Sequence, residues 1–251
     1  MNEKFTAKVN LGQVFYWNPW RGCKKISEAC DNCWVRLQGQ ITYTARKLPK
    51  ADPGTVILMS LQTDFFIEDA DIYRADAWKE IKDHPDYIFL LITKRIERVK
   101  DCLPDDWGSG YDNVVICVTT ETQARADERI PILLDLPVKH KWVTCSPCLE
   151  AIDLSKYIDQ LEFVEACGEK GDPKVVRPTY FEWVEQLSTL CKEHNVRFSL
   201  MHIGHKFIKD GNTLAEPRGV TCYHSRNAEA LQLDNGVPIK FNLGFGEYTI
   251  E

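Results

Sequence analysis

The sequence has no apolar run that approaches the roughly 18 residues of a membrane-spanning helix. Residues 1–13 are polar and contain no apolar core of a secretory signal. A basic surplus is also missing, because the net charge is −6 at pH 7. These absences argue against a membrane protein, a secreted protein and a general nucleic-acid coat protein, although a local patch could still hold a nucleic acid. We therefore expect a cytoplasmic chain.

Cysteine, by contrast, is abundant, with 10 residues in a chain of 251. Clustered cysteines in a cytosolic chain of this size bind metal or do redox work more often than they form disulfides. Three of them form the motif Cys23-x6-Cys30-x2-Cys33. The scattered ones lie mostly in apolar surroundings and are expected to be small buried side chains: Cys102, Cys117, Cys145, Cys148, Cys167, Cys191 and Cys222.

Short apolar runs alternate with amphipathic segments along most of the chain. Strands are predicted over 55–59, 87–92, 114–118, 141–144, 161–167 and 197–201. Helices are predicted over 31–46, 74–83, 95–102, 122–135, 151–159 and 180–191, with Pro131 as a break or kink. This alternation predicts an α/β fold with a mainly parallel sheet, as a partial or closed (β/α) barrel.

The predicted barrel core covers 17–211, between an N-terminal extension over 1–16 and a small C-terminal extension over 212–251. Within the C-terminal extension, Asn235-Gly236 predicts the turn of a hairpin. Polar residues follow every predicted strand, at the edge where parallel α/β sheets carry their chemistry. The sequence therefore predicts a polar, charged pocket at that edge.

The three clustered cysteines could wrap one metal centre, because they share a short loop that contains glycine. Nearby basic residues and a following helix N-terminus favour thiolates. Structural zinc would need a fourth ligand, from Cys145, Cys148 or a histidine. A four-iron cluster would keep one iron free of protein, able to chelate the amino and carboxylate groups of S-adenosylmethionine (SAM). The spacing leaves cluster, zinc and unligated thiols open.

The stretch Trp17-Asn18-Pro19-Trp20-x-Gly22 that leads into Cys23-x6-Cys30-x2-Cys33 resembles the signature of the phage-associated branch of the radical SAM superfamily. Further stretches are similar to that family in the same order: 60–66 (SLQTDFF), 91–95 (LITKR), 118–121 (VTTE), 125–131 (RADERIP), 146–147 with 152–154 (SP and IDL), and 168–171 with 177–178 (GEKG and RP). The likeness covers about residues 17 to 205. This chain departs from the family pattern at 147–148, at Cys167 and at 201–204. These departures concern the substrate end of the predicted pocket more than the cluster end.

The resemblance implies a [4Fe–4S] cluster on Cys23, Cys30 and Cys33, bound SAM and an external electron donor. The activity it implies is cleavage of SAM to a 5′-deoxyadenosyl radical, which abstracts hydrogen from an unidentified substrate. A nucleic acid or modified base fits the phage-type branch, and a local basic stretch surrounds the motif. Oligomeric state and substrate are left open.

Residues expected to contact SAM or an anionic ligand are Trp34, Ser60, Asp64, Lys94, Thr119, Glu121 and Glu169. The alternative for Trp34 is a place in the core, and for the others it is a turn, a helix cap or a solvated charge. Cys145 and Cys148 are predicted as a catalytic pair, with a structural role as the alternative. The competing hypothesis for the whole chain is a zinc-stabilised α/β binding module for nucleic acid or protein, without catalysis.

Overall fold

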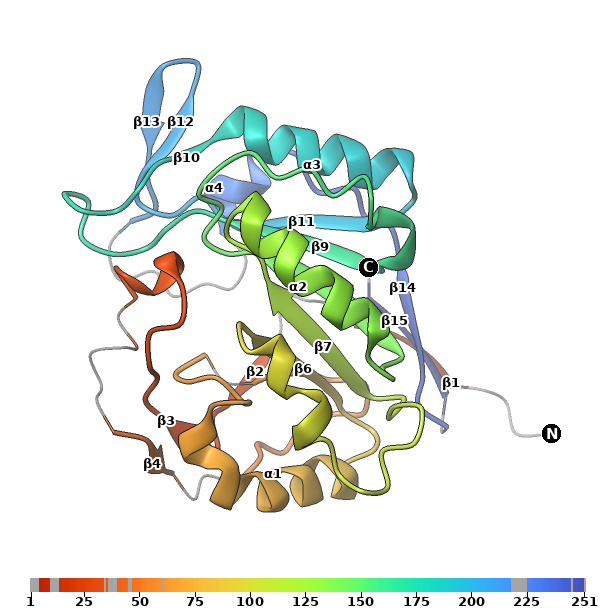
Figure 1. Cartoon of the computed structure of the whole chain (residues 1–251). Helices are drawn as coiled ribbons and strands as arrows, with labels where there is room; N and C mark the ends of the chain where they lie inside the picture. The colour runs from red at the N-terminus through yellow and green to blue at the C-terminus, as the bar shows by residue number, and fades with distance from the viewer. Residues whose placement is uncertain are drawn as a thin grey trace.

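The computed structural model describes residues 5–9, 14–33, 35, 40–44, 47–59, 61–217, 225–244 and 246–250, and only the backbone of 5–9. At its centre, a seven-stranded parallel sheet of order β11-β9-β8-β7-β6-β5-β2 curls into a half-barrel (Figure 1). Its strands are β2 (Phe15–Trp17), β5 (Val56–Met59), β6 (Ile88–Thr93), β7 (Val114–Thr119), β8 (His140–Cys145), β9 (Phe163–Cys167) and β11 (Arg197–His202). All six predicted strands are confirmed, and the α/β sheet is compatible with a partial barrel.

Three helices cover one face of this sheet: α1 (Asp71–Asp83), α2 (Gln123–Asp135) and α3 (Phe181–Glu193) (Figure 1). Successive strand residues point to opposite faces, so alternate residues such as Leu91 and Val118 pack against the helices. Thr122 caps α2 by accepting a hydrogen bond from the Arg125 amide. Pro131 lies inside α2 without ending it, so the predicted break is not observed.

A smaller sheet covers the opposite face at the base of the half-barrel. It consists of β1 (Phe5–Val9), β15 (Gly246–Ile250) and β14 (Ile239–Asn242), in that order. Side chains such as Phe241 and Tyr248 pack against Val56, Leu90 and Trp142 of the large sheet. The first and the last strand therefore pair beneath the half-barrel, on its inner face.

The C-terminal hairpin is present, but its predicted turn at Asn235-Gly236 is wrong, because β14 and β15 pair further along the chain. The Asn235 amide instead donates to the Val196 carbonyl and accepts from the Phe198 amide, which fastens it to β11. The Asn235 side-chain oxygen also accepts from the Val237 amide at 3.2 Å, so its side chain joins a local bend to the segment at the start of β11.

The remaining elements are short. They are β3 (Trp20–Arg21), η1 (Glu28–Cys30), β4 (Thr42–Tyr43), η3 (Glu68–Ala70), η4 (Ile96–Arg98), η5 (Lys100–Cys102), η6 (Ile158–Gln160), β10 (Thr179–Tyr180), β12 (Phe207–Lys209), β13 (Asn212–Leu214) and α4 (Arg226–Glu229). The helix predicted over 95–102 is two 3₁₀ turns, and only η6 forms near 151–159. The helix predicted over 31–46 lies largely outside the described residues, and 42–43 form a strand. No helix in the described ranges is both long and apolar enough to cross a membrane.

Candidate functional site

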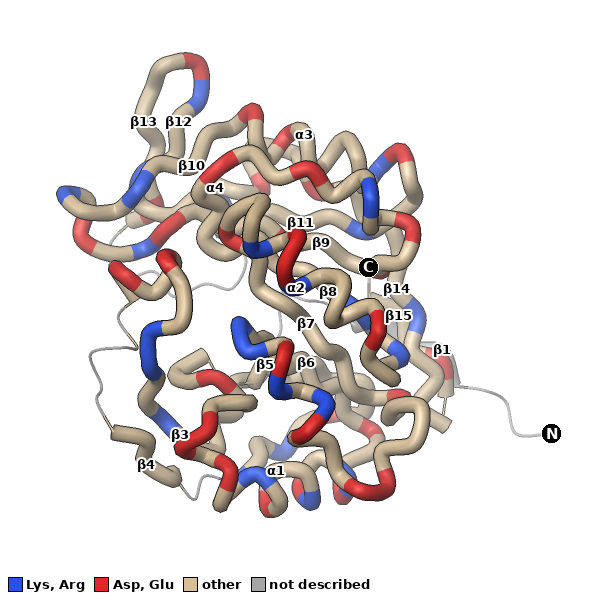
Figure 2. The backbone as a smooth tube through the Cα atoms, in the orientation of Figure 1, with Lys and Arg blue, Asp and Glu red and all other residues tan. Residues whose placement is uncertain are grey.

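The cysteine loop, defined as residues 22–33, follows β2, the first strand of the half-barrel in the chain. Cys23 and Cys33 are half-buried, Cys30 is buried at the end of η1, and all three are free of disulfides. Cys33 donates from its amide to the Cys30 carbonyl at 3.3 Å, which wraps the loop around η1. Cys23 and Cys30 lie close enough to interact electrostatically. Figure 2 shows the basic stretch between β3 and η1 that contains Lys24 and Lys25.

The first end of the loop is fastened to residues that follow β5 and β6. Gly22 donates from its amide to the Gln62 carbonyl at 3.0 Å. The buried guanidinium of Arg95 donates from Nη2 to the Lys24 carbonyl at 3.0 Å and from Nη1 to the Cys23 sulfur at 3.8 Å. Burial raises the pKa of the Cys23 thiol above its ordinary value, although Arg95 acts in the opposite direction.

Asp64 holds this arrangement in place. Its Oδ1 accepts from the Phe66 amide and the Thr93 hydroxyl, at 2.9 and 2.8 Å. Its Oδ2 accepts from the Lys94 amide at 3.0 Å and from Arg95 Nη1 at 3.3 Å. Asp64 was predicted to bind the amino group of SAM, but both oxygens already have two donors. It therefore acts first as a support for Arg95, and its contact with a ligand stays a prediction.

The far end of the loop is fastened to the segment that follows β9. Asn32 donates from Nδ2 to Glu169 Oε2 at 3.1 Å, and Arg177 binds the same carboxylate through its guanidinium and its amide. Arg177 Nη1 also donates to the Glu28 carbonyl at 2.9 Å. Burial works against the charge of Glu169, but the hydrogen bonds from Arg177 outweigh it and lower the pKa.

A third attachment joins η1 to α2. The Glu28 carboxylate accepts from Arg125 Nη2 at 3.0 Å and from the Thr122 hydroxyl at 3.1 Å. Burial alone would raise the pKa of Glu28, but the hydrogen bonds from Arg125 and Thr122 lower it to about 2. The cysteine loop is thus tied to segments that follow β5, β6, β7 and β9.

Several buried polar atoms at the same edge of the sheet have no hydrogen-bond partner among the described residues: Gln62 Oε1, Thr63 Oγ1, Thr119 Oγ1, Glu121 Oε1 and His202 Nδ1. Leaving one such atom unsatisfied costs about 1–3 kcal/mol. Polar atoms of this kind are explained when a ligand or ordered water satisfies them. Because they lie where the parallel strands end, this edge of the sheet is the candidate binding site.

A family model described as protein of unknown function (DUF5131) matches residues 40–232, which is more than half of the chain. The chain belongs to the DUF5131 family. No curated protein and no solved structure matches it. The DUF5131 match includes Asp64, Arg95 and Glu169, whereas the cysteine loop precedes it.

The donor set of this DUF5131 protein fits a cluster in its chemistry, because Cys23, Cys30 and Cys33 are free thiols on one loop. Within the described ranges, no three His, Cys, Asp or Glu side chains are grouped so as to hold one metal ion. All cysteine sulfurs of a zinc site lie about 2.3 Å from the same zinc ion, whereas each cysteine of a four-iron cluster binds a different iron. Cluster ligands therefore stand further apart than zinc ligands. The buried polar atoms without partners in the described part of the chain, at the carboxyl edge of the sheet that we call the rim, suit a second, polar ligand.

A row of polar residues crosses the inner face of the DUF5131 half-barrel. Thr119, Thr144, Glu165 and Ser199 are register partners on β7, β8, β9 and β11, and all are buried. The Thr144 hydroxyl donates to Glu165 Oε1 at 2.8 Å. Sequence reasoning missed Glu165 because it lies inside an apolar run. A charged residue in the middle of a buried strand was the signal that could have identified it.

Of the remaining residues predicted to contact a ligand, the structure describes Glu121 and Lys94 but not Trp34 and Ser60. Glu121 is fully buried, with Oε2 accepting from Arg129 Nη1 at 2.9 Å and Oε1 without a partner in the described part of the chain. Lys94 is half-buried, with its ammonium close enough to Cys117 to interact electrostatically. Trp34 and Ser60 lie outside the described residues. Their roles toward SAM stay predictions.

Cys145 and Cys148 lie in the core between the sheet and the helices, together with Cys191. Both have no exposed surface. Burial raises the pKa of Cys145 to about 12 and that of Cys148 well above its ordinary value. Because the thiolate is the reactive form, these surroundings favour the structural role over the predicted catalytic one.

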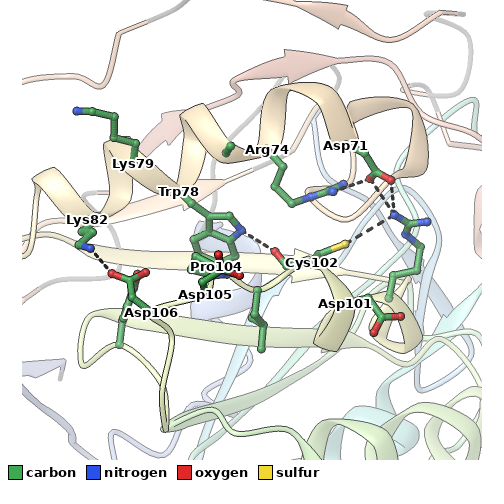
Figure 3. A pocket seen from close by; sticks show the side chains of 14 residues that line it. Asp71, Arg74, Trp78, Lys79, Lys82, Asp101, Cys102, Pro104, Asp105 and Asp106 are labelled. Atoms are coloured by element: carbon green, nitrogen blue, oxygen red, sulfur yellow. Dashed lines mark hydrogen bonds and ion pairs between the residues drawn. The ribbon is translucent and has the colours of Figure 1, made fainter.

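A pocket of about 720 Å³ lies between α1 and the loop that follows η5 (Figure 3). Its charged walls are largely paired: Arg74 and Arg98 both bind Asp71, and Lys82 binds Asp106. None of the unsatisfied buried atoms in the described part of the chain belongs to it. The candidate site is therefore the cysteine loop and the adjoining rim.

Proposed function

We propose that this protein is a radical SAM enzyme in which Cys23, Cys30 and Cys33 hold a [4Fe–4S] cluster. The observation that carries the proposal is the attachment of the cysteine loop to the carboxyl edge of a parallel half-barrel. When bound and reduced by an external electron donor, the cluster would supply one electron to the sulfonium of SAM. Its carbon–sulfur bond to the adenosyl group would break into methionine and a 5′-deoxyadenosyl radical, which would take hydrogen from a substrate.

The residues around the loop have definable tasks in this proposal. Asp64 and Arg95 fix the position of Cys23, while Glu169 and Asn32 fix the segment between Cys30 and Cys33. Ligands held from several strands keep their geometry better than ligands on an unsupported loop. The loop is thereby prepared to receive a rigid inorganic centre.

The rim and the inner polar row would bind the organic ligands. Thr119 Oγ1 and Glu121 Oε1 are buried acceptors without partners among the described residues, so an ammonium or hydroxyl group would satisfy them. Glu165 adds a buried carboxylate on the inner face, beside Thr144. The protein would thereby orient SAM and its substrate and exclude water from the radical. A nucleic-acid or modified-base substrate stays a prediction.

Anaerobic purification with metal analysis tests the proposal. The full chain is reconstituted with iron and sulfide, and both elements are quantified per chain. After reduction with dithionite in the presence of SAM, 5′-deoxyadenosine is measured by liquid chromatography. We expect about four irons and four sulfides per chain, and formation of 5′-deoxyadenosine.

Cys30→Ala should abolish both the cluster and the product. Cys102→Ala is the matched control, because Cys102 is a buried thiol at the end of η5, outside the loop. Zinc near one per chain with no iron would overturn the proposal and favour a zinc-stabilised binding module. A cluster that yields no 5′-deoxyadenosine in the wild-type chain would overturn the assignment to SAM chemistry.

A further inference from the structure

The guanidinium of Arg95 has an unusual position for a charged group. Its side chain is only 4% exposed, although it stands at the rim of the sheet. Nη1 faces both Asp64 Oδ2 at 3.3 Å and the Cys23 sulfur at 3.8 Å. Nη2 donates to the Lys24 carbonyl at 3.0 Å, which fixes the plane of the guanidinium against the loop.

This arrangement brings a permanent positive charge to one sulfur of the cysteine motif. Arginine keeps its proton at every accessible pH, so the charge cannot be lost by titration. Its burial removes most of the solvent that would screen the charge, although the adjacent Asp64 carboxylate acts on the Cys23 sulfur in the opposite sense. Neighbouring Arg98, in the same 3₁₀ turn, instead binds the Phe66 carbonyl and Asp71. Arg95 alone of this pair is directed at a cysteine of the loop.

Hydrogen bonds to the cysteine sulfurs are among the factors that set the reduction potential of an iron–sulfur cluster. Reduction adds one negative charge to the cluster. A fixed cation that donates to a ligand sulfur stabilises the reduced form more than the oxidised form, and so raises the potential.

We propose that Arg95 is a positioning residue that acts through the sulfur of Cys23 to raise the reduction potential of the cluster. This inference rests on the function proposed above. It assigns to Arg95 a task different from the binding of an anionic ligand, because both of its terminal nitrogens are already engaged.

Potentiometric titration of the reconstituted full chain, followed by electron paramagnetic resonance, tests the inference. Arg95→Gln removes the charge and Arg95→Lys keeps it without the forked geometry. We expect a shift of the midpoint to more negative potential in both variants, larger for Arg95→Gln, at unchanged iron and sulfide content. Arg98→Gln is the matched control and should leave the midpoint unchanged.

A second measurement uses the wild-type chain and does not depend on a variant that folds. Protein labelled with ¹⁵N only in the arginine guanidinium is reduced, and electron spin echo spectra are recorded. We expect a weak ¹⁵N coupling to the cluster, present also in Arg98→Gln. No such coupling, or an unchanged midpoint in Arg95→Gln, would overturn this inference alone. A chain that assembles no iron and sulfide would overturn both proposals.

Discussion

Asn32 donates a hydrogen bond of 3.1 Å to the buried carboxylate of Glu169, which stands 137 residues further along the chain. Asn32 lies between the second and third cysteines of the motif, and Glu169 follows Gly168, the first residue after β9. A β carbon on Gly168 would lie 2.0 Å from the Ile203 carbonyl oxygen, so only glycine permits this approach of the two segments that follow β9 and β11. The cysteine loop therefore depends on close packing at the end of the half-barrel.

Replacing Glu169 should destabilise the whole chain. Glu169→Ala removes the acceptor of Asn32 and leaves the partly buried guanidinium of Arg177 without its carboxylate. We expect a loss of about 2–4 kcal/mol in the free energy of unfolding, measured by urea denaturation. Glu193→Ala, at the exposed end of α3, is the control and should change it by less than about 0.5 kcal/mol. Equal stability of both variants would contradict the anchoring role.

The attachment of Glu28 should make stability depend on pH in the acid range. Its pKa is lowered from 4.5 to about 2 in the folded chain, so the unfolded chain binds a proton first as the pH falls. The stabilisation is therefore complete above about pH 4.5 and is lost as the pH falls toward about 2.

Unfolding free energies of wild type and Glu28→Gln, measured at several pH values, test this dependence. The difference between the two should be largest near neutral pH and should shrink in acid, because protonation and substitution remove the same charge. Glu97→Gln, an exposed residue in η4, is the control and should give a constant difference. A Glu28→Gln difference that grew in acid would refute the prediction.

Two threonines of the inner polar row should respond oppositely to the same substitution. Thr119 Oγ1 has no partner among the described residues, so Thr119→Val should leave stability unchanged or raise it by about 1 kcal/mol. The Thr144 hydroxyl donates to Glu165, so Thr144→Val should lower stability by about 1.5–3 kcal/mol.

Chemical denaturation measures these changes, and equilibrium dialysis with SAM adds a second readout. Under the proposed function, Thr119→Val weakens binding of SAM without a loss of stability. A destabilised Thr119→Val variant with unchanged binding would show that Thr119 serves the fold and not the ligand.

Thiol alkylation should distinguish the loop cysteines from those of the core. Cys33 is half-buried, whereas Cys145 is fully buried with its pKa raised to about 12. In folded, metal-free protein near pH 8, iodoacetamide should modify Cys33 well before Cys145, as followed by peptide mass spectrometry. Both should react at similar rates in denatured protein, which is the control. Early modification of Cys145 in the folded chain would contradict its placement.

The strands were predictable because each is a short, almost continuous apolar run, and that signal is local. A continuous apolar run does not reveal which face of the sheet each residue occupies. Both faces are covered, so apolar and polar residues do not alternate along the strand. Glu165 therefore went unnoticed on the inner face, and Cys145 was predicted as catalytic although it packs against the helices. The turn at Asn235 failed for a related reason, because its amide also bonds to Val196 and Phe198, which no local pattern reveals.

Spacing along the chain was sufficient to single out Cys23, Cys30 and Cys33, because motif and loop are contiguous in sequence. The partners of that loop could be known only once the strands lay side by side. Arg95 stands 72 residues from Cys23, and Glu169 stands 137 residues from Asn32. No local pattern encodes contacts at such separations, since they arise where the carboxyl ends of parallel strands meet at one edge of the sheet.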